Sequence, residues 1–165
     1  MAVATKSKLK VADEVWAIAA LLQYENPKRE DFTIEEIMDR ARTEKLTDLL
    51  RPGFYVHVIQ HCVANRPPNP GAYRILFETA PGRRRLFRQG DRSHPAREAG
   101  KITPLRQDLP TRFANLLDWY REWSSHSLQA PAEADPLLRL RNSGRKLWSD
   151  EHADDYVRRL REGWE

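Results

Sequence analysis

Residues 52–88, PGFYVHVIQHCVANRPPNPGAYRILFETAPGRRRLFR, carry the pattern that decides the fold. Pro52 suits the first turn of a helix, and the proline-rich run RPPNPG at 66–71 cannot continue one. A helix is therefore predicted from Pro52 to about Asn65. Its predicted apolar face holds Tyr55, Val58, Ile59, Cys62 and Val63. Its predicted opposite face holds His57, Gln60, His61 and Ala64.

A β-hairpin is predicted after this helix. The run AYRILFE at 72–78 alternates like a strand, with the apolar side chains Tyr73, Ile75 and Phe77 two residues apart. Pro81 and Gly82 mark a turn, and RRLFR at 84–88 is predicted to return as a second strand. The predicted tip of the hairpin carries three consecutive arginines, Arg83, Arg84 and Arg85.

Two helices are predicted before this stretch and one after it. The first runs from Leu9 to Tyr24, with an apolar face made by Val11, Val15, Ile18, Ala19 and Leu22. The second begins with a capping box of Thr33 and Glu36, has Phe32 placed to pack on Ile37, and ends near Lys45. Residues 89–112 read as loop, and a last helix is predicted over 112–123, with a core face of Phe113, Leu116, Leu117, Tyr120 and Trp123.

Three helices followed by a β-hairpin is the order of a winged helix-turn-helix. The predicted fold class is α+β, mostly α: a winged helix-turn-helix domain over 9–123, a linker over 124–134 and an extended helical tail over 135–165. In such a domain the third helix enters the major groove, which predicts base contacts by His57, Gln60 and His61. Arg83, Arg84 and Arg85 would contact phosphates. The alternative is that both groups only form a polar, solvated surface.

The charge distribution favours a phosphate-binding partner for the middle of the chain. Residues 51–112 carry 12 basic and 4 acidic side chains, whereas residues 1–50 carry 8 basic and 10 acidic ones. A local positive excess is typical of proteins that bind double-stranded nucleic acid. An arginine-rich surface that only interacts with solvent is the alternative.

Composition argues against several other classes. No apolar run approaches the ~20 residues of a membrane span, and the first residues lack the apolar core of a signal peptide. The one cysteine, Cys62, allows no internal disulfide and fits a cytoplasmic protein; it is expected to be buried. The histidines at 94, 126 and 152 have no partners at metal-ligand spacing, and no catalytic motif is present. We therefore expect no enzyme activity, no metal and no cofactor.

The tail, DPLLRLRNSGRKLWSDEHADDYVRRLREGWE at 135–165, is too short to build a core of its own. It is predicted to form two short helical pieces, the second starting after Ser149. It either packs back on its own domain or binds another protein. Its candidate partner-binding residues are Leu147, Trp148, Tyr156, Val157, Arg158, Leu160, Arg161 and Trp164.

Two resemblances reach particular residues. The segments HVIQHCVANRPPNPGAYRI (57–75), FRQGD (87–91), REAGKITP (97–104) and DLPTRFANLLDWYREW (108–123) resemble a bacterial winged-helix family of largely unassigned function. The resemblance implies a DNA-binding fold more than a biological role.

The segment SGRKLWSDEHADDYVRRLREGWE (143–165) resembles the C-terminal tail of VapB-like type II antitoxins. That resemblance implies a PIN-domain ribonuclease toxin as partner and operator DNA as the ligand of the head. Antitoxin heads of this group are usually of other folds, so the chain departs from the family there. The resulting hypothesis is an antitoxin that binds double-stranded operator DNA and neutralises the toxin, either as a homo-oligomer or as a toxin–antitoxin hetero-oligomer. The alternative is a stand-alone DNA-binding regulator or scaffold whose tail packs on itself.

Overall fold

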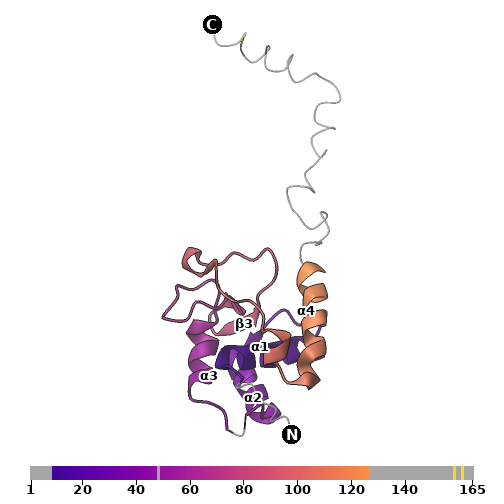
Figure 1. Ribbon diagram of the computed structural model, residues 1–165. Helices are drawn as coiled ribbons and strands as arrows, with labels where there is room; N and C mark the ends of the chain where they lie inside the picture. Colours follow the sequence, from indigo (N-terminus) through magenta and orange to yellow (C-terminus); the bar gives the residue numbers. More distant parts are fainter. Residues whose placement is uncertain (1–8, 48, 127–157, 159–160, 162–165) are drawn as a thin grey trace. The chain divides into compact units, whose positions relative to one another are not determined.

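The computed structural model describes residues 9–47, 49–126, 158 and 161 (Figure 1). The chain divides into two units, residues 1–128 and 129–165. The first has an α+β architecture, as the sequence predicts. Its main elements are, in order, α1 (Val11–Glu25), β1 (Phe32–Thr33), α2 (Ile34–Glu44), α3 (Gly53–Val56), the π-helix η1 (His57–His61), β2 (Leu76–Ala80), β3 (Arg83–Leu86) and α4 (Ala114–His126).

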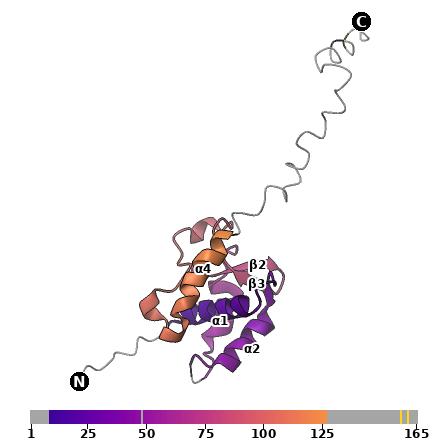
Figure 2. The same cartoon turned by 90° about the vertical axis from the view of Figure 1, so that its right-hand side faces the viewer.

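The three strands form one small antiparallel sheet in the order β1-β3-β2. Strands β2 and β3 make the predicted hairpin, with Leu76 opposite Leu86 and Phe77 opposite Arg85 (Figure 2). The turn needs Gly82, whose φ of 75° lies in the left-handed region. The first strand of the hairpin begins at Leu76, later than predicted. Strand β1 pairs through Phe32 opposite Arg84, so the sheet joins a segment before α2 to the hairpin.

Helix α2 begins as the sequence predicts. The backbone N–H of Glu36 donates to the Thr33 hydroxyl at 3.1 Å, and the Thr33 N–H donates to the Glu36 carboxylate at 2.8 Å. Phe32 and Ile37 are both buried in the core. The helix ends at Lys45, which adopts a left-handed conformation with φ of 50°. The capping box, a local sequence signal, therefore decides the start of this helix.

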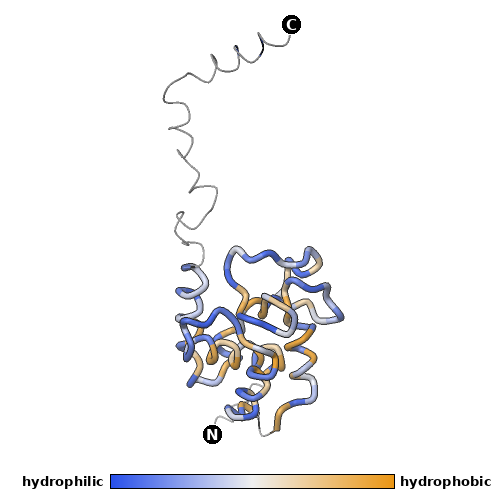
Figure 3. Tube along the Cα trace, turned by 180° about the vertical axis from the view of Figure 1, so that it is seen from behind, coloured by the Kyte–Doolittle hydropathy of each residue, from blue (hydrophilic) through white to orange (hydrophobic). Residues whose placement is uncertain are grey.

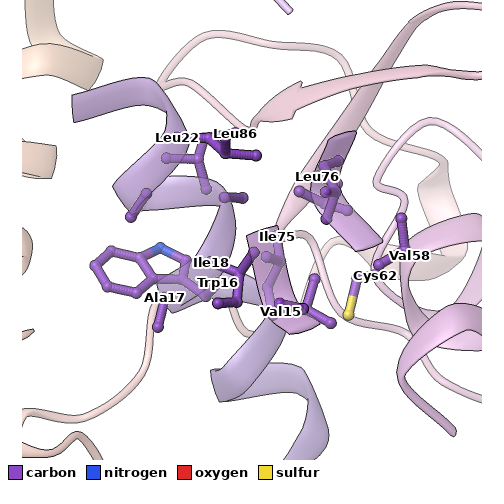
Figure 4. Packing of buried hydrophobic residues seen from close by; sticks show 14 of the residues in the cluster. Val15, Trp16, Ala17, Ile18, Leu22, Val58, Cys62, Ile75, Leu76 and Leu86 are labelled. Atoms are coloured by element: carbon purple, nitrogen blue, oxygen red, sulfur yellow. The ribbon is translucent and has the colours of Figure 1, made fainter. Parts of the chain in front are cut away.

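Residues 12–20 of helix α1 are buried on every side, so the prediction of a one-sided apolar face is wrong for this part of the helix. All residues from Ala12 to Ala20 are buried, including Asp13 and Glu14. Other elements surround α1, and Figure 4 shows its side chains against those of Val58 and Cys62 and of the strand residues Leu76 and Leu86. A helix covered all round must pair its charges. Lys101 Nζ lies 2.6 Å from Asp13 Oδ1, and Arg51 Nη2 lies 2.6 Å from Glu14 Oε2.

The helix predicted over 52–65 is shorter, and its buried face differs from the predicted one at Tyr55 and Ala64. After one turn of α3 the chain widens into η1, where the Cys62 N–H donates to the His57 carbonyl at 2.9 Å, and the helix ends at His61. Val58, Cys62 and Val63 are buried as predicted. Phe54 is buried as well, and so is Ala64, which was predicted on the opposite face. Tyr55, predicted to be in the core, is 49% exposed.

Residues between the hairpin and α4 contain three short 3-10 helices, Pro95–Arg97, Arg106–Asp108 and Thr111–Phe113. Hydrophilic and hydrophobic stretches alternate along the trace of this domain (Figure 3). The predicted core face of α4 is confirmed: Phe113, Leu116, Leu117 and Tyr120 are buried, and Trp123 is partly buried. Helix α4 continues to His126, so residues 124–126 belong to the helix and not to the predicted linker.

Candidate nucleic-acid interface

The polar residues predicted to read bases share one helical segment, and each of them is partly buried. His57 Nδ1 lies 2.8 Å from the Gly53 carbonyl oxygen, and the His57 and His61 rings meet edge to face at 4.9 Å. Burial lowers the pKa of His57, and the nearby His61 and Arg51 lower it further. Gln60 Nε2 donates to the Pro67 carbonyl at 2.9 Å. His57 Nδ1 and Gln60 Nε2 are thereby engaged with backbone carbonyls and are not available to read a base.

The proline-rich segment 66–71 lies against this helical segment. A Cβ atom on Gly71 would come within 2.8 Å of the His61 Cβ atom, so only glycine fits there without a shift. His61 Nδ1 is buried and has no hydrogen-bond partner among the described residues. The segment therefore covers part of the face on which His57, Gln60 and His61 were predicted to be accessible.

Arg97 joins the end of η1 to the proline-rich segment. Its side chain is fully buried, and its guanidinium donates five hydrogen bonds of 2.6 to 3.1 Å, all to backbone carbonyls. Desolvation by burial lowers its pKa. No sequence pattern indicates this role for Arg97, because an arginine within a loop looks like a solvated charge. The acceptors are the carbonyl oxygens of Gln60, His61, Arg66, Pro67 and Tyr73.

Two of the three hairpin arginines are not at the surface, which corrects their expected role. Arg84 is 1% exposed, and its Nη1 donates to the Glu78 carboxylate at 3.0 Å. Arg85 is 8% exposed and holds Asp91 through two hydrogen bonds of 2.6 and 2.8 Å. These two side chains tie the hairpin to its surroundings and are not free to contact a phosphate. Adjacent strand residues point to opposite faces of the sheet, so both are buried because both faces of β3 are covered here, which a run of three arginines does not reveal.

Arg83 is the hairpin arginine that keeps a large exposed surface, 40% of its side chain. Its Nη2 lies 2.6 Å from Asp31 Oδ1, and Thr79 donates to the other carboxylate oxygen of Asp31 at 2.7 Å. The hydrogen bond from Arg83 is the main cause that lowers the pKa of Asp31, followed by the one from Thr79. Arg83 thus sits in an ion pair that solvent can reach.

Ion pairs with carboxylates neutralise most of the basic side chains of residues 51–112, the basic segment. Among its 12 cations, eight lie within 4.0 Å of a carboxylate oxygen, and several of these carboxylates come from other parts of the chain. Residues 9–126 together carry 19 basic and 16 acidic side chains. The positive excess counted along the sequence is therefore largely balanced in three dimensions. The pairs outside the hairpin are Arg51–Glu14, Arg66–Glu78, Lys101–Asp13, Arg106–Asp118 and Arg112–Glu44.

The side of this helical segment that does face solvent is apolar. Tyr55 and Val56 are 49% and 39% exposed, and Leu49, in the connection that precedes the helix, is 83% exposed. This surface was not predicted from the sequence, because Tyr55 was expected in the core. The adjacent residue Phe54 occupies the core position that was predicted for Tyr55. The two neighbouring aromatic residues differ only in how well each packs in the core.

Three further predictions concern Cys62, metal binding and membrane-spanning helices. Cys62 is buried, as expected, and burial raises the pKa of its thiol. Within the described residues, no group of three or more His, Cys, Asp or Glu side chains is placed to hold a metal ion. Of the helices that the structure describes, none has the length and apolar character needed to cross a membrane.

The predicted partner-binding residues fall mostly outside the described part of the chain. Arg158 and Arg161 are described; both are helical and exposed. The others, Leu147, Trp148, Tyr156, Val157, Leu160 and Trp164, lie outside the described residues, as does His152.

Comparison of the chain with protein-family models, with curated proteins and with solved structures finds no match in any of the three. The function is therefore inferred from the residues and their geometry.

Proposed function

We propose that the chain is an antitoxin-like regulator with two modules. Residues 9–126 act as a winged-helix head that binds double-stranded operator DNA, and residues 135–165 act as a tail that neutralises a PIN-type ribonuclease. The observation that carries the head assignment is the pairing of β1 with β3. A strand between the first two helices that pairs with a later hairpin also occurs in winged helices, and this supports the proposal. This supports DNA binding by analogy of fold, so the contacts need their own test.

The hairpin's contact with DNA is proposed to depend on Arg83. Its guanidinium is partly exposed and can exchange Asp31 for a phosphate oxygen, because both are anionic oxygen acceptors. Arg84 and Arg85 support the hairpin from within. The proposed head therefore has fewer phosphate contacts than its sequence suggests, and a correspondingly weak salt dependence.

The tail's action is proposed to depend on arginine. Arg158 and Arg161 are three residues apart in a helical segment, a spacing that places two side chains on one face. A PIN nuclease holds Mg²⁺ with several carboxylates, and a guanidinium can pair with carboxylates through two parallel hydrogen bonds. Trp148 and Trp164 are proposed as anchors, since tryptophan in a desolvated pocket dominates many interfaces.

The two modules would be coupled by effective concentration. A toxin that bridges two tails brings two heads together, and the second head then binds neighbouring DNA without a new diffusional encounter. Repression would therefore depend on the ratio of toxin to antitoxin.

The test of the tail uses the full chain and the product of the neighbouring short gene, if that gene encodes a protein with spaced Asp and Glu residues. Trp164→Ala is expected to release the partner, because truncation of such an anchor costs about 2–4 kcal/mol. Arg158→Ala combined with Arg161→Ala is expected to leave a weaker complex that regains Mg²⁺-dependent RNA cleavage. Arg159→Ala, one residue after Arg158 and two before Arg161, is the matched control and should still inhibit.

Absence of binding between the full chain and that gene product would sink the antitoxin assignment. The stand-alone DNA-binding regulator would then be the better account, provided that the chain binds duplex DNA. For DNA, Arg83→Ala should lower the slope of log affinity against log salt by roughly one unit. An unchanged slope would remove the hairpin from the interface.

A further inference from the structure

Two histidines, His57 and His61, stand at the two ends of η1, and the proposed function leaves this pair without a role. Their rings meet edge to face with centroids 4.9 Å apart, and both residues are partly buried. His57 Nδ1 lies 2.8 Å from the Gly53 carbonyl oxygen, which can only accept. The neutral ring of His57 therefore carries its proton on Nδ1.

The proline-rich segment packs directly on His61. A Cβ atom on Gly71 would come within 2.8 Å of His61 Cβ and 3.1 Å of His61 Cγ, so the backbone and the imidazole are in close contact. His61 Nδ1 is buried and has no hydrogen-bond partner among the described residues. A protonated imidazole carries an N–H on both nitrogens, so the cation would bury a charged donor without an acceptor at this contact.

The charged groups around His57 oppose a positive charge on its ring. Burial is the main cause that lowers the pKa of His57, the hydrogen bond to Gly53 opposes this, and His61 and Arg51 lower the pKa further. Glu14 of α1, the nearby carboxylate, pairs with Arg51. Among the described residues, neither ring of the pair forms an ion pair with a carboxylate.

The residues that follow the proline-rich segment bring one neutral ring and one further cation to the pair. The Tyr73 ring lies 6.1 Å from the His57 ring, and a phenol is neutral at and below pH 7.5. Arg97 Nη1 donates to the His61 carbonyl at 2.7 Å. Two protonated rings 4.9 Å apart would also repel each other. The closed arrangement therefore accommodates the pair in its neutral state.

Arg97 holds both ends of the proline-rich segment, whereas its middle is held only by packing. The Arg97 guanidinium donates to the carbonyls of Arg66 and Pro67 before the middle and to that of Tyr73 after it. In the described part of the chain, residues 68–71 take part in no hydrogen bond. Asn69 and Pro70 are exposed. Residues 68–71 can therefore leave η1 without breaking a hydrogen bond.

We propose that His57 and His61 form a pH-sensitive latch, in which protonation of the pair lifts residues 68–71 off η1 while Arg97 keeps both ends in place. Opening gives the charged rings access to water and uncovers the face of η1 that the segment covers. The burial that lowers the pKa of His57 favours the closed form above pH 6.5, its ordinary pKa, and this advantage is lost as pH falls below 6.5. The latch needs neither DNA binding nor toxin binding.

The test follows the contact between Gly71 and His61 by NMR on the full chain. At pH 7.5 the Gly71 Hα protons should give a strong nuclear Overhauser effect to the His61 Hβ protons, because the two residues are in contact. At pH 5 this effect should be lost, with the same midpoint at which the imidazole carbon shifts report protonation of the two rings. Effects between the rings of Trp16 and Tyr120, whose centroids lie 5.7 Å apart in the core, should persist.

Variants assign the opening to the histidine pair. His57→Phe combined with His61→Phe removes the titration and keeps two aromatic rings, so Gly71 should stay in contact with the side chain at position 61 at pH 5. His126→Gln is the matched control, because His126 is an exposed histidine on α4. This variant should lose the contact between Gly71 and His61 at the same pH as the parent.

Four outcomes would overturn the latch: a contact that survives protonation of both rings, rings that stay neutral at pH 5, loss of the contact in the double variant at pH 5, and loss of the effects between Trp16 and Tyr120 in the same step. The last would mean that acid unfolds the whole domain. If the double variant does not fold, the titration of the parent decides alone. DNA and toxin binding are measured separately, so failure of the latch leaves the proposed function untouched.

Discussion

The buried arginines and the exposed arginines of this domain have different roles. Arg84, Arg85 and Arg97 are nearly or fully buried, and their guanidinium groups hold the hairpin, the end of η1 and the proline-rich segment. Arg29 and Arg106 form ion pairs that are about half open to solvent. The comparison teaches that a count of arginines along a sequence does not measure a surface field. Exposure and partners decide whether each one stabilises the fold or meets a ligand.

Among substitutions that test this comparison, the largest loss of stability is expected at Arg97. Arg97→Met keeps much of the volume but leaves five carbonyl oxygens without their donor in the interior. Buried acceptors that lose a charged donor are costly, so the free energy of unfolding should fall by about 3–5 kcal/mol. Urea denaturation measures it. Arg92→Met, at an exposed position of the same basic segment, is the control, and a loss at Arg97 no larger than at Arg92 would contradict the structural role.

A smaller loss of stability is expected when the ion pair between Arg85 and Asp91 is removed. Arg85→Ala removes both hydrogen bonds to the carboxylate, which also accepts from the Arg88 N–H at 2.7 Å. We expect a loss of about 2–3 kcal/mol, because Asp91 keeps part of its pairing. A double-mutant cycle with Asp91→Asn should give a coupling well above that of a surface pair. Additive losses would mean that the two side chains do not depend on each other.

The surface pair of Arg29 and Glu36 should contribute less, and only above acidic pH. The hydrogen bond from Arg29, followed by that from the Thr33 N–H, lowers the pKa of Glu36 from its usual 4.5 to about 2. A carboxyl whose pKa falls on folding stabilises the fold above pH 4.5 and loses that contribution as pH falls towards 2.

Arg29→Ala should therefore cost a few tenths to about 1 kcal/mol at pH 7, because the pair is exposed and solvent screens it. The difference from the parent should vanish near pH 2. An NMR titration of Glu36 should show its pKa rising in the variant but staying below 4.5, since the Thr33 hydrogen bond remains. A difference in stability that is constant from pH 7 to pH 2 would show that Arg29 acts by another route.

The smallest effect is expected at Arg106. Its pair with Asp118 has 55% of both side chains exposed, so Arg106→Ala should leave the melting temperature unchanged within error. A clear drop would show that exposure alone does not separate the two classes of arginine.

Features of the fold that depend on neighbouring residues were predictable from sequence. The capping box of Thr33 and Glu36, the turn at Gly82 and the core face of α4 follow from contacts between residues a few positions apart. Such contacts depend on backbone geometry that is nearly the same in every protein. The candidate site was harder to predict, because the exposure of Tyr55 depends on whether it or Phe54 enters the core, and both are aromatic.

The sequence by itself determined the α+β class, the hairpin and most helix positions, since periodicity and turn residues act locally. Only the tertiary structure decided that residues 12–20 of α1 are buried on all sides, that Arg84 and Arg85 face inward, and that Arg97 closes the end of η1. Each of these depends on groups distant along the chain, as when Lys101 pairs with Asp13 across 88 residues. Local pattern fixes what a segment can form, whereas burial and ion pairing depend on which distant segment covers it.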